Sequence, residues 1–574
     1  MEIKRINYVP QPNNVKDIIY RSADKFADCT AFTIKHQKDK EVSYEKVTYK
    51  RLLDDANKLG TGLYKLGFAG KRIAIVGKNR YEWALSYVTN FLGGIISVPL
   101  DKDLQYDELE RSLIRSKAEC VIFDEKLEED ITKIRNQEKT SLKEFICMSE
   151  LKGFKSIPEV MKEGNDALEN AYNDFINVKI DNDKMAVLLF TSGTTAQSKA
   201  VMLSQKNIAT NVWDLQSMED INNKDVSIAL LPFHHIFGST CMIYTLSCGV
   251  NIVFADGLRY VKQNLAEYKV SMFVGVPLLM DSIYKGVVKE IEKQGKTKLI
   301  KIATKISNGL LKLKIDIRRK LFKQVINGLG GALRLVIIGG APADPNVLKA
   351  FDNFGIITLQ GYGLSETAPV VAAENPKNKK NGTCGQAMPS VTLEVVNKDE
   401  FGIGEIRAKG DSVMLGYYEM PDETNEVLRD GWFYTGDLGY LDPKGNITIT
   451  GRTKNMIVLA NGKKVFPEEI ETLLNRMPLI EESMVFGMPS KEDKNDVTLS
   501  AKVVYNKEVA EEKYNGMSEE EIKKVIWNDV KELNKSFPRY KHIQNLIVTG
   551  EELVKTTTKK VIRREEMKKI LADQ

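Results

Sequence analysis

The sequence predicts an α/β protein with a large N-terminal domain of mostly parallel sheets flanked by helices, followed by a small α+β C-terminal domain. Short apolar runs rich in β-branched residues recur before helical patterns, which is typical of parallel sheets covered by helices. The chain has 574 residues, too many for one hydrophobic core, so we expect two or three domains. The runs expected to form strands of the large domain are residues 72–77, 120–124, 186–190, 227–232, 251–255, 272–277 and 333–340.

An uncharged stretch from Trp83 to Leu100 has about the minimum length that crosses a bilayer. Its polar residues, paired glycines and late proline favour a buried helix that leads into a buried strand, so we predict no transmembrane segment. The first residues, MEIKRINYVPQPNN, lack the apolar region of a signal peptide, which favours a cytoplasmic location.

The pattern changes near residue 389 to short strands with tight turns, which predicts a small antiparallel β subdomain. A second unit follows, with a helix, two strands and a further helix that begins at a capping box formed by Ser518 and Glu521. The predicted domains are therefore residues 1–452 and residues 453–574.

Composition argues against several classes of function. The 83 basic and 78 acidic residues give a net charge of only +5, which offers no strong reason to expect nucleic acid as a partner. The six cysteines are scattered and the four histidines form no cluster with them, so the sequence predicts neither a disulfide framework nor a zinc site.

The stretch LLFTSGTTAQSKAVMLS places an apolar strand before a loop rich in hydroxyl groups, and then a lysine. Backbone N–H groups, hydroxyls and a lysine suit a polyphosphate. The P-loop pattern does not fit, because Ser198 stands in place of its second glycine and Ala200 follows the lysine. An ordinary loop is the alternative interpretation. The candidate phosphate-binding residues are Thr191, Ser192, Gly193, Thr194, Thr195 and Lys199.

The motif GYGLSET sets Tyr362 between Gly361 and Gly363 and continues with Ser365 and Glu366. In such a set the tyrosine is suited to stack on a base, and the glutamate is suited to hold Mg²⁺ on phosphate oxygens. The motif therefore adds a nucleotide base and a metal ion to the polyphosphate hypothesis.

Two charged residues further along the chain extend this pattern. Asp437, in YTGDLGYLD, is a carboxylate able to accept hydrogen bonds from both hydroxyls of a ribose, and Arg452 follows in GRTKNMI. As alternatives, Asp437 fixes a turn and Arg452 is a solvated strand residue. Four such motifs in one chain favour a nucleotide site.

The chain resembles the adenylate-forming (AMP-binding) superfamily of acyl-CoA synthetases, adenylation domains and luciferases over nearly its whole length. It is most similar to bacterial long-chain fatty acyl-CoA synthetases in NRYEWALSYVTNFLGGIISVPLD, in the long segment before LRLVIIGGAPADP, and in the TTTKK ending. The motifs that carry the resemblance are TSGTTAQSK, LPFHHIFG, IIGGAP, GYGLSET, GWFYTGDLG, GRTKNMIVLANGKKVFPEEIE and VKTTTKKVIRR.

The resemblance implies an AMP-forming acyl-CoA ligase that uses ATP, Mg²⁺ and CoA. A carboxylic acid, expected to be a medium- or long-chain fatty acid, attacks the α-phosphorus of ATP to give acyl-AMP, and the thiol of CoA then displaces AMP. Transfer to the phosphopantetheine of an acyl carrier protein is an alternative, since it presents the same thiol arm. A degenerate nucleotide-binding protein without activity is a second alternative.

The resemblance also assigns the nucleotide contacts. The loop that ends at Lys199, with Mg²⁺ held by Glu366, would carry the β- and γ-phosphates, and Ser365 would bond the α-phosphate. Asp437 and Arg452 would hold the ribose. The residues implied for the adenine slot are Gly340, Ala341, Gly361 and Tyr362.

The remaining implied residues concern catalysis and domain movement. Lys560 aligns with the lysine that bridges the substrate carboxylate and the α-phosphate, so we expect it to be catalytic. Lys454 aligns with the hinge about which a small, mobile C-terminal domain turns, and Gly462 would then contact the pantetheine of CoA. His235 is expected to gate or orient the substrate carboxylate, with packing in an aromatic cluster as the alternative, and His234 is the less favoured partner.

The chain departs from the family pattern at two places. Ala196, Ser198 and Ala200 replace glycine, proline and glycine in the phosphate loop, for which we expect a slightly different loop path. Near the C-terminus Lys559 replaces a glycine, which makes it a rival to Lys560 as the catalytic lysine.

Residues 281–323 combine basic and apolar side chains in a pattern that suits either an anionic membrane surface or the solvated face of a surface helix. The basic residues of its second half are Lys312, Lys314, Arg318, Arg319, Lys320 and Lys323.

Overall fold

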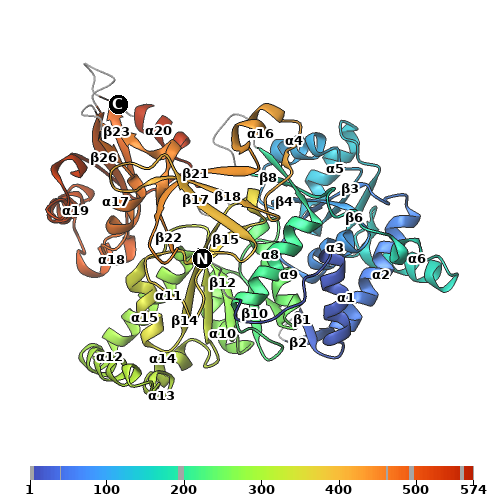
Figure 1. The fold of residues 1–574 in the computed structure, drawn as a ribbon, viewed down its shortest axis with the longest axis horizontal. Coiled ribbons are helices and arrows are strands. Elements are labelled where there is room, and N and C mark those ends of the chain that lie inside the picture. Colours follow the sequence, from blue (N-terminus) through green and yellow to red (C-terminus); the bar gives the residue numbers. More distant parts are fainter. Residues whose placement is uncertain are drawn as a thin grey trace.

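The computed structural model describes residues 5–38, 41–191, 199–459, 463–489, 497–555 and 561–572. Two large sheets with helices on their faces make up most of the N-terminal part, and the C-terminal residues, orange to red in Figure 1, pack beside them. The N-terminal helices are α1 (Val15–Lys25), α2 (Tyr49–Lys65), α3 (Tyr81–Leu92), α4 (Tyr106–Ser116), α5 (Glu128–Gln137), α6 (Ile157–Glu169), α7 (Asp174–Asn177), α8 (Gln205–Met218), α9 (Ile236–Ser247), α10 (Val261–Glu267), α11 (Pro277–Lys293), α12 (Thr297–Lys312), α13 (Arg318–Leu321), α14 (Lys323–Gly328), α15 (Pro345–Asn353) and α16 (Pro421–Val427).

The first large sheet has nine strands, and its central strands run parallel. They are β1 (Thr30–Lys38), β2 (Glu41–Thr48), β10 (Val226–Ala229), β11 (Asn251–Phe254), β12 (Met272–Gly275), β13 (Leu335–Ile338), β14 (Ile357–Gly363), β15 (Val370–Ala373) and β16 (Gln386–Ala387). The order is β16-β15-β14-β13-β12-β10-β11-β1-β2, with antiparallel pairing only at the two ends. The GYGLSET motif therefore begins at the carboxyl end of a parallel strand, where α/β proteins place their ligands.

The second large sheet has eight strands. They are β3 (Arg72–Val76), β4 (Ile96–Leu100), β5 (Cys120–Phe123), β6 (Glu144–Cys147), β7 (Lys155–Ser156), β8 (Met185–Phe190), β9 (Ala200–Ser204) and β19 (Gly416–Tyr417). Their order is β19-β9-β8-β4-β3-β5-β6-β7, and the strands from β8 to β7 are parallel. The pair β8 and β9 is antiparallel, so the predicted phosphate loop is the connection of a hairpin.

The predicted fold class is confirmed, because each of the seven apolar runs forms a strand of these sheets. The uncharged stretch Trp83–Leu100 forms most of α3 and then β4, as predicted, and all side chains of α3 except Glu82 are buried. Among the described residues, no helix has both the length and the apolar character that a membrane span needs.

The predicted β subdomain is an antiparallel sheet in the order β17-β18-β21-β20, with β22 paired to β21. Its strands are β17 (Val391–Val396), β18 (Gly404–Gly410), β20 (Leu428–Arg429), β21 (Trp432–Leu441) and β22 (Ile447–Arg452). The sheet ends at Arg452, next to the predicted domain boundary.

The C-terminal part has a small sheet and a hydrophobic core of its own, formed by residues between Leu459 and Ile543. Its capping box is present, with the Ser518 backbone N–H donating to Glu521 Oε2 at 2.8 Å. The boundary between residues 452 and 453 stays a prediction. The elements of this part are β23 (Ile457–Val458), β24 (Lys464–Val465), α17 (Pro467–Leu474), β25 (Ile480–Pro489), β26 (Val497–Tyr505), α18 (Lys507–Lys513), α19 (Glu519–Asn534), β27 (Asn545–Thr549) and α20 (Arg563–Ala572).

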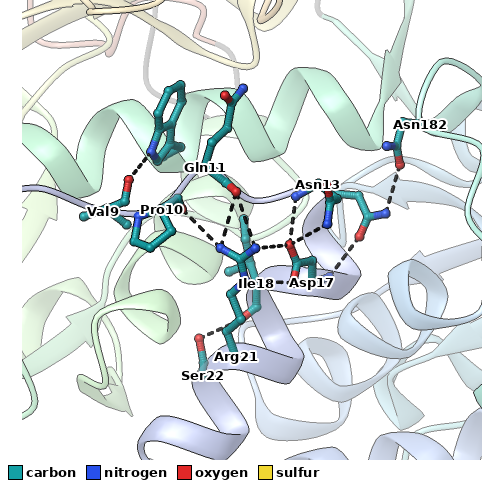
Figure 2. A network of polar contacts seen from close by, with 11 residues as sticks. Val9, Pro10, Gln11, Asn13, Asp17, Ile18, Arg21, Ser22 and Asn182 are labelled. Carbon is teal, nitrogen blue, oxygen red and sulfur yellow. Dashed lines mark hydrogen bonds and ion pairs between the residues drawn. The ribbon is translucent and has the colours of Figure 1, made fainter.

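The N-terminal segment is held against α1 by a polar network (Figure 2). Arg21 donates to the backbone carbonyls of Pro10 and Gln11 and pairs with Asp17, which also accepts from the Asn13 backbone. The indole of Trp213 on α8 donates to the carbonyl of Val9 at 2.7 Å. The segment thereby connects α1 to α8, a helix that lines the candidate site.

We expect replacement of Gly164 by alanine to destabilise the fold by about 1–3 kcal/mol, because α6 crosses α2 at backbone contact. An added Cβ would lie 1.9 Å from the carbonyl oxygen of Lys58 and 2.7 Å from the amide nitrogen of Gly62. Both are backbone atoms, so only movement of a helix can relieve the overlap. The midpoint of thermal unfolding, followed by circular dichroism, measures the effect.

The matched control is Gly286→Ala in α11, where an added Cβ meets no atom within 4 Å. Alanine is the better helix former, so this change should leave stability unaltered or raise it by up to about 1 kcal/mol. Equal losses in the two variants would contradict the close crossing of α2 and α6.

Candidate active site

A cavity of about 2580 Å³ lies between the large sheets, the β subdomain and the C-terminal part. Every predicted site residue within the described ranges lines it. These residues are Thr191, Lys199, His235, Gly340, Ala341, Gly361, Tyr362, Gly363, Ser365, Glu366, Asp437, Arg452 and Lys454. Ser192, Gly193, Thr194, Thr195, Gly462 and Lys560 lie outside the described residues, as do Ala196, Ser198 and Lys559.

The two ends of the predicted phosphate loop meet at the edge of the eight-stranded sheet. The Thr191 backbone N–H donates to the Lys199 carbonyl at 2.8 Å, and the Thr191 hydroxyl donates to the same oxygen at 3.2 Å. Phe190 and Ala200 are register partners of the hairpin directly before and after. Thr191 and Lys199, the described residues on either side of the loop, therefore lie next to each other on the cavity wall.

Tyr417 connects the lysine of this loop to the predicted metal-binding carboxylate. Lys199 Nζ lies 4.4 Å from the centroid of the Tyr417 ring, and the Tyr417 hydroxyl donates to Glu366 Oε1 at 2.9 Å. Burial, together with the adjacent Glu366, raises the pKa of Tyr417, so the hydroxyl stays protonated and remains a donor. Lys199 therefore lies over the face of the Tyr417 ring, and Glu366 lies at its hydroxyl.

Sequence reasoning missed Tyr417. It lies on β19, which pairs antiparallel with β9 directly after the phosphate loop, although 218 positions separate Lys199 from Tyr417 in the chain. The available signal is the pair Gly416–Tyr417, a glycine followed by an aromatic residue, and that pair has no recognisable spacing from either partner.

The backbone around Glu366 leaves little freedom. Glu366 lies in a single 3₁₀ turn (Ser365–Thr367), and its carbonyl accepts the backbone N–H of Met414 at 2.8 Å. A Cβ on Gly363 would lie 2.0 Å from the Pro369 carbonyl oxygen, so this position admits only glycine. The carboxylate is thus presented to the cavity by a closely packed turn.

Asp437 is the centre of a second group of charged and polar side chains. Its carboxylate accepts from the Tyr362 hydroxyl at 2.7 Å through Oδ2 and pairs with Arg452 Nε at 2.8 Å through Oδ1. Burial raises the pKa of Tyr362 well above its usual range, and the Asp437 charge adds to this. Because both oxygens of Asp437 already have partners, a ribose hydroxyl would have to share or replace one of them.

Lys454 lies between these two groups rather than apart from them. It lies exposed in the turn after β22, and partial desolvation lowers its pKa, with Arg452 adding to the effect and Asp437 and Glu366 opposing it. The positive charge of Lys199 also lowers the pKa of Lys454. The predicted hinge residue therefore belongs to a set of three cations and two carboxylates, an excess of positive charge that suits a polyanion.

The ends of the segment that contains Lys559 and Lys560 are attached to the C-terminal sheet. Lys555 forms a bridge with Val561 and pairs with Glu482, while Arg563 Nη2 lies 2.5 Å from Glu471 Oε1. Lys555, Val561 and Arg563 all line the cavity. The described residues on both sides of residues 556–560 therefore lie at the cavity wall.

The two histidines have different surroundings. His235 caps α9, and its ring Nδ1 accepts the backbone N–H of Phe237 at 3.2 Å, so its ring orientation is tied to the start of the helix. His234 Nε2 lies 3.4 Å from Asp101 Oδ2, and burial lowers the pKa of His234 while Asp101 opposes the shift. Both residues line the cavity, and the gating role of His235 stays a prediction.

An apolar arm of the cavity extends from His235 between α8, α9 and β14. Phe237 packs against Gly339, where an added Cβ would lie 2.9 Å from the ring. Burial raises the pKa of Glu219 in this arm well above its usual range, which favours its uncharged form. The other side chains of the arm are Leu215, Met218, Cys241, Tyr244, Ile337 and Leu359. An uncharged chain fits this lining.

Comparisons with known proteins agree with this geometry. The model of the AMP-binding enzyme family matches residues 19–418, and that of the AMP-binding enzyme C-terminal domain matches residues 454–574. The chain is 30% identical to long-chain-fatty-acid–CoA ligase 5 of Rattus norvegicus, over 77% of this chain and 69% of the relative. It is 27% identical to the long-chain-fatty-acid–[acyl-carrier-protein] ligase AEE15 of Arabidopsis thaliana, over 90% and 80% of the two chains.

A bacterial relative and a solved structure extend the comparison. Long-chain-fatty-acid–CoA ligase FadD15 of Mycobacterium bovis is 26% identical over 80% of this chain and 79% of its own length. The crystal structure of the anthranilate CoA ligase AuaEII with anthranoyl-AMP has a TM-score of 0.76 at 19% identity and covers 99% of both chains. At that identity the structure shows a shared fold and no more.

Proposed function

Because the chain belongs to the AMP-binding enzyme family and is an ATP-dependent, AMP-forming acid–thiol ligase, we propose that it joins a medium- or long-chain fatty acid to CoA. The observation that best supports this substrate is the apolar arm, which opens into the same cavity as Lys199, Glu366 and Asp437. The names of the relatives at 26–30% identity point to the same class of acid.

In the first half-reaction the carboxylate of the fatty acid attacks the α-phosphorus of ATP, and pyrophosphate leaves. The step brings two anions together, so the site must neutralise charge and hold both reactants in line. Lys199 and the loop before it would receive the β- and γ-phosphates, and Ser365 the α-phosphate. Asp437 and Arg452 would hold the ribose, with the Tyr362 hydroxyl shifting its bond to make room.

The residues present fit a Mg²⁺ ion that arrives with ATP. In the described residues no group of three or more His, Cys, Asp or Glu side chains could hold a metal by itself. Mg²⁺ commonly uses one carboxylate together with substrate phosphates and water, and Glu366 supplies that carboxylate while Tyr417 occupies only its Oε1. When bound, the ion would neutralise phosphate charge during attack.

In the second half-reaction the CoA thiol attacks the carbonyl carbon of acyl-AMP, and AMP leaves. We propose that the C-terminal domain turns about Lys454 between the two steps, which withdraws Lys560 and brings Gly462 to the pantetheine. Lys454 would move from among the site charges toward solvent as it turns. Desolvation lowers its pKa in the site, so solvent would stabilise its charged form.

A carrier protein is the second candidate acceptor. One relative that matches 90% of this chain is named as an acyl-carrier-protein ligase, and a phosphopantetheine carries the same thiol as CoA. The chemistry on the acid side would be unchanged.

The test is pyrophosphate release from Mg-ATP across saturated acids from acetate to octadecanoate and a set of aryl acids, with CoA, with a holo-carrier protein, or with neither. We expect release to peak among the longer fatty acids and to turn over repeatedly only with CoA. A peak at aryl or short acids would refute the substrate class, and turnover only with the carrier would refute the acceptor.

A variant in the apolar arm ties chain-length preference to the structure. Cys241→Phe adds bulk where α9 faces the arm, so the ratio of kcat/KM for octadecanoate to that for octanoate should fall by about tenfold or more. Cys241→Ser is the size-matched control and should keep the ratio. An unchanged ratio in Cys241→Phe would place the acyl chain elsewhere.

A further inference from the structure

The segment from α12 to α13 carries an unusual density of exposed apolar side chains. Between residues 299 and 321, seven large hydrophobic residues are from 37% to 70% exposed. They are Leu299, Ile302, Ile306, Leu311, Leu313, Ile315 and Leu321, which we call the α12 patch. Exposed apolar side chains concentrated in one short segment favour an interaction site on a folded protein.

Apolar side chains of α12 are exposed along one side of the helix. Leu299, Ile302 and Ile306 follow each other at spacings of three and four residues and are 61%, 56% and 54% exposed. The inward side already has half-buried apolar residues next to the buried Ser307, namely Ile300, Ala303 and Leu310. Apolar side chains thus extend beyond the inward side, and burial within the chain does not explain the exposed ones.

Basic residues surround the α12 patch. Residues 297–323 contain nine lysines and arginines and a single acidic residue, Asp316, whereas the whole chain has a net charge of only +5. Lys298, Lys301 and Lys305 are exposed along the side of the apolar stripe, and in the part of the chain that the structure describes none of the three forms an ion pair. Arg318 is paired with Asp316, so the charge available to a partner is mainly that of the lysines.

The α12 patch lies at an outer edge of the molecule and is connected to the cavity. In Figure 1, α12, α13 and α14 form the lower left corner, away from α19 and α20 of the C-terminal part. The preceding helix, α11, follows Val276, whose Cγ1 lies 3.8 Å from where a Cβ of Gly340 would be. Helix α11 therefore begins beside the candidate site and ends just before the α12 patch.

We propose that the α12 patch docks on an anionic membrane surface, at the cytoplasmic face. Apolar side chains flanked by lysines on one helix face are the pattern of helices that lie in the lipid interface, with the hydrocarbon inserted and the ammonium groups at the head groups. A second copy of this chain is a poor occupant, since two faces of the same strong positive charge would repel each other.

Sedimentation of the full-length protein with vesicles tests the proposal. We expect binding to vesicles of phosphatidylglycerol and phosphatidylcholine and little binding to phosphatidylcholine alone. The Lys298→Gln/Lys301→Gln/Lys305→Gln variant should lower the partition coefficient on the order of 100-fold, because each basic residue near an anionic surface contributes roughly a fivefold factor. The Ile302→Ser/Ile306→Ser variant should also bind less, at unchanged net charge.

The matched control removes the same charge elsewhere. Lys524→Gln/Lys531→Gln/Lys535→Gln changes three exposed lysines on and just after α19 and should leave vesicle binding unaltered. An equal loss of vesicle binding in this control would show that binding depends only on the net charge of the protein, and it would overturn the proposed docking surface. Absence of vesicle binding by the unmodified protein would overturn the proposal as well. Self-association of the protein that Ile302→Ser/Ile306→Ser abolishes would also overturn it, because the α12 patch would then bind a protein partner.

Discussion

Replacing Lys560 with alanine is expected to lower the rate of pyrophosphate release by about 10²- to 10³-fold, the loss typical of a preorganised charge at the reacting centre. The physical reason is that a cation between the attacking carboxylate and the α-phosphate reduces the repulsion between two anions. The described residues on either side of residues 556–560, Lys555 and Val561, pair through their backbones and line the cavity. Single-turnover release from Mg-ATP and the best acid measures the effect.

Lys559→Ala is the control, because it removes the neighbouring positive charge from the same segment. Arg563 remains anchored to Glu471 in both variants, so the attachment of the segment should persist. Thioester formation from added acyl-AMP should survive in Lys560→Ala, since the lysine is needed only for adenylation. The reverse pattern, with Lys559→Ala inactive and Lys560→Ala active, would shift the catalytic role by one residue.

The sheets could be predicted because buried parallel strands appear in the sequence as continuous apolar runs between helical patterns. Residues 335–338 and 272–275 are such strands, and each lies within a predicted run. The motif residues could also be predicted, because their residue types supply polar groups with particular chemistry and occur in motifs that resemble a known superfamily. These residues meet in one cavity because of how the two sheets are arranged, and a local sequence pattern does not predict that arrangement.

The missed features depend on contacts between distant segments. Tyr417 reaches Glu366 only because a two-residue strand adds to the edge of the sheet beside Lys199. The bond from Tyr362 to Asp437 similarly joins the nine-stranded sheet to the β subdomain. The sequence identified Glu366, Tyr362 and Asp437 as site residues, but it did not show which side chains they would contact.

The direction of an amphipathic helix is a further limit. The sequence of residues 297–312 has an apolar stripe, and periodicity alone would turn that stripe toward the core. In the structure only one side of the stripe is partly buried, at Ile300, Ala303 and Leu310, whereas Leu299, Ile302 and Ile306 are exposed. The exposure of these side chains in the structure favours the membrane surface over an ordinary solvated helix face.

Replacing Glu366 with glutamine is expected to lower the rate of pyrophosphate release by about 10²- to 10³-fold and to raise the Mg²⁺ concentration needed for half-maximal rate. Glutamine keeps the shape of the side chain, and its amide oxygen can still accept from the Tyr417 hydroxyl. The turn that holds residue 366 should therefore be unchanged, and the loss would come from the carboxylate charge. A titration of the rate with Mg²⁺ at saturating ATP measures both effects.

The Tyr417→Phe variant distinguishes the effect of the Glu366 charge from the effect of the hydrogen bond that positions Glu366. It removes only the hydroxyl, so Glu366 keeps its negative charge and Lys199 keeps the ring it lies over. We expect a smaller loss of rate, about tenfold, and an unchanged Mg²⁺ requirement, since one neutral donor has been lost. If Glu366→Gln instead matched Tyr417→Phe in rate and in Mg²⁺ dependence, Glu366 would serve as the acceptor that orients Tyr417 and Lys199, and the metal would depend on phosphate oxygens alone.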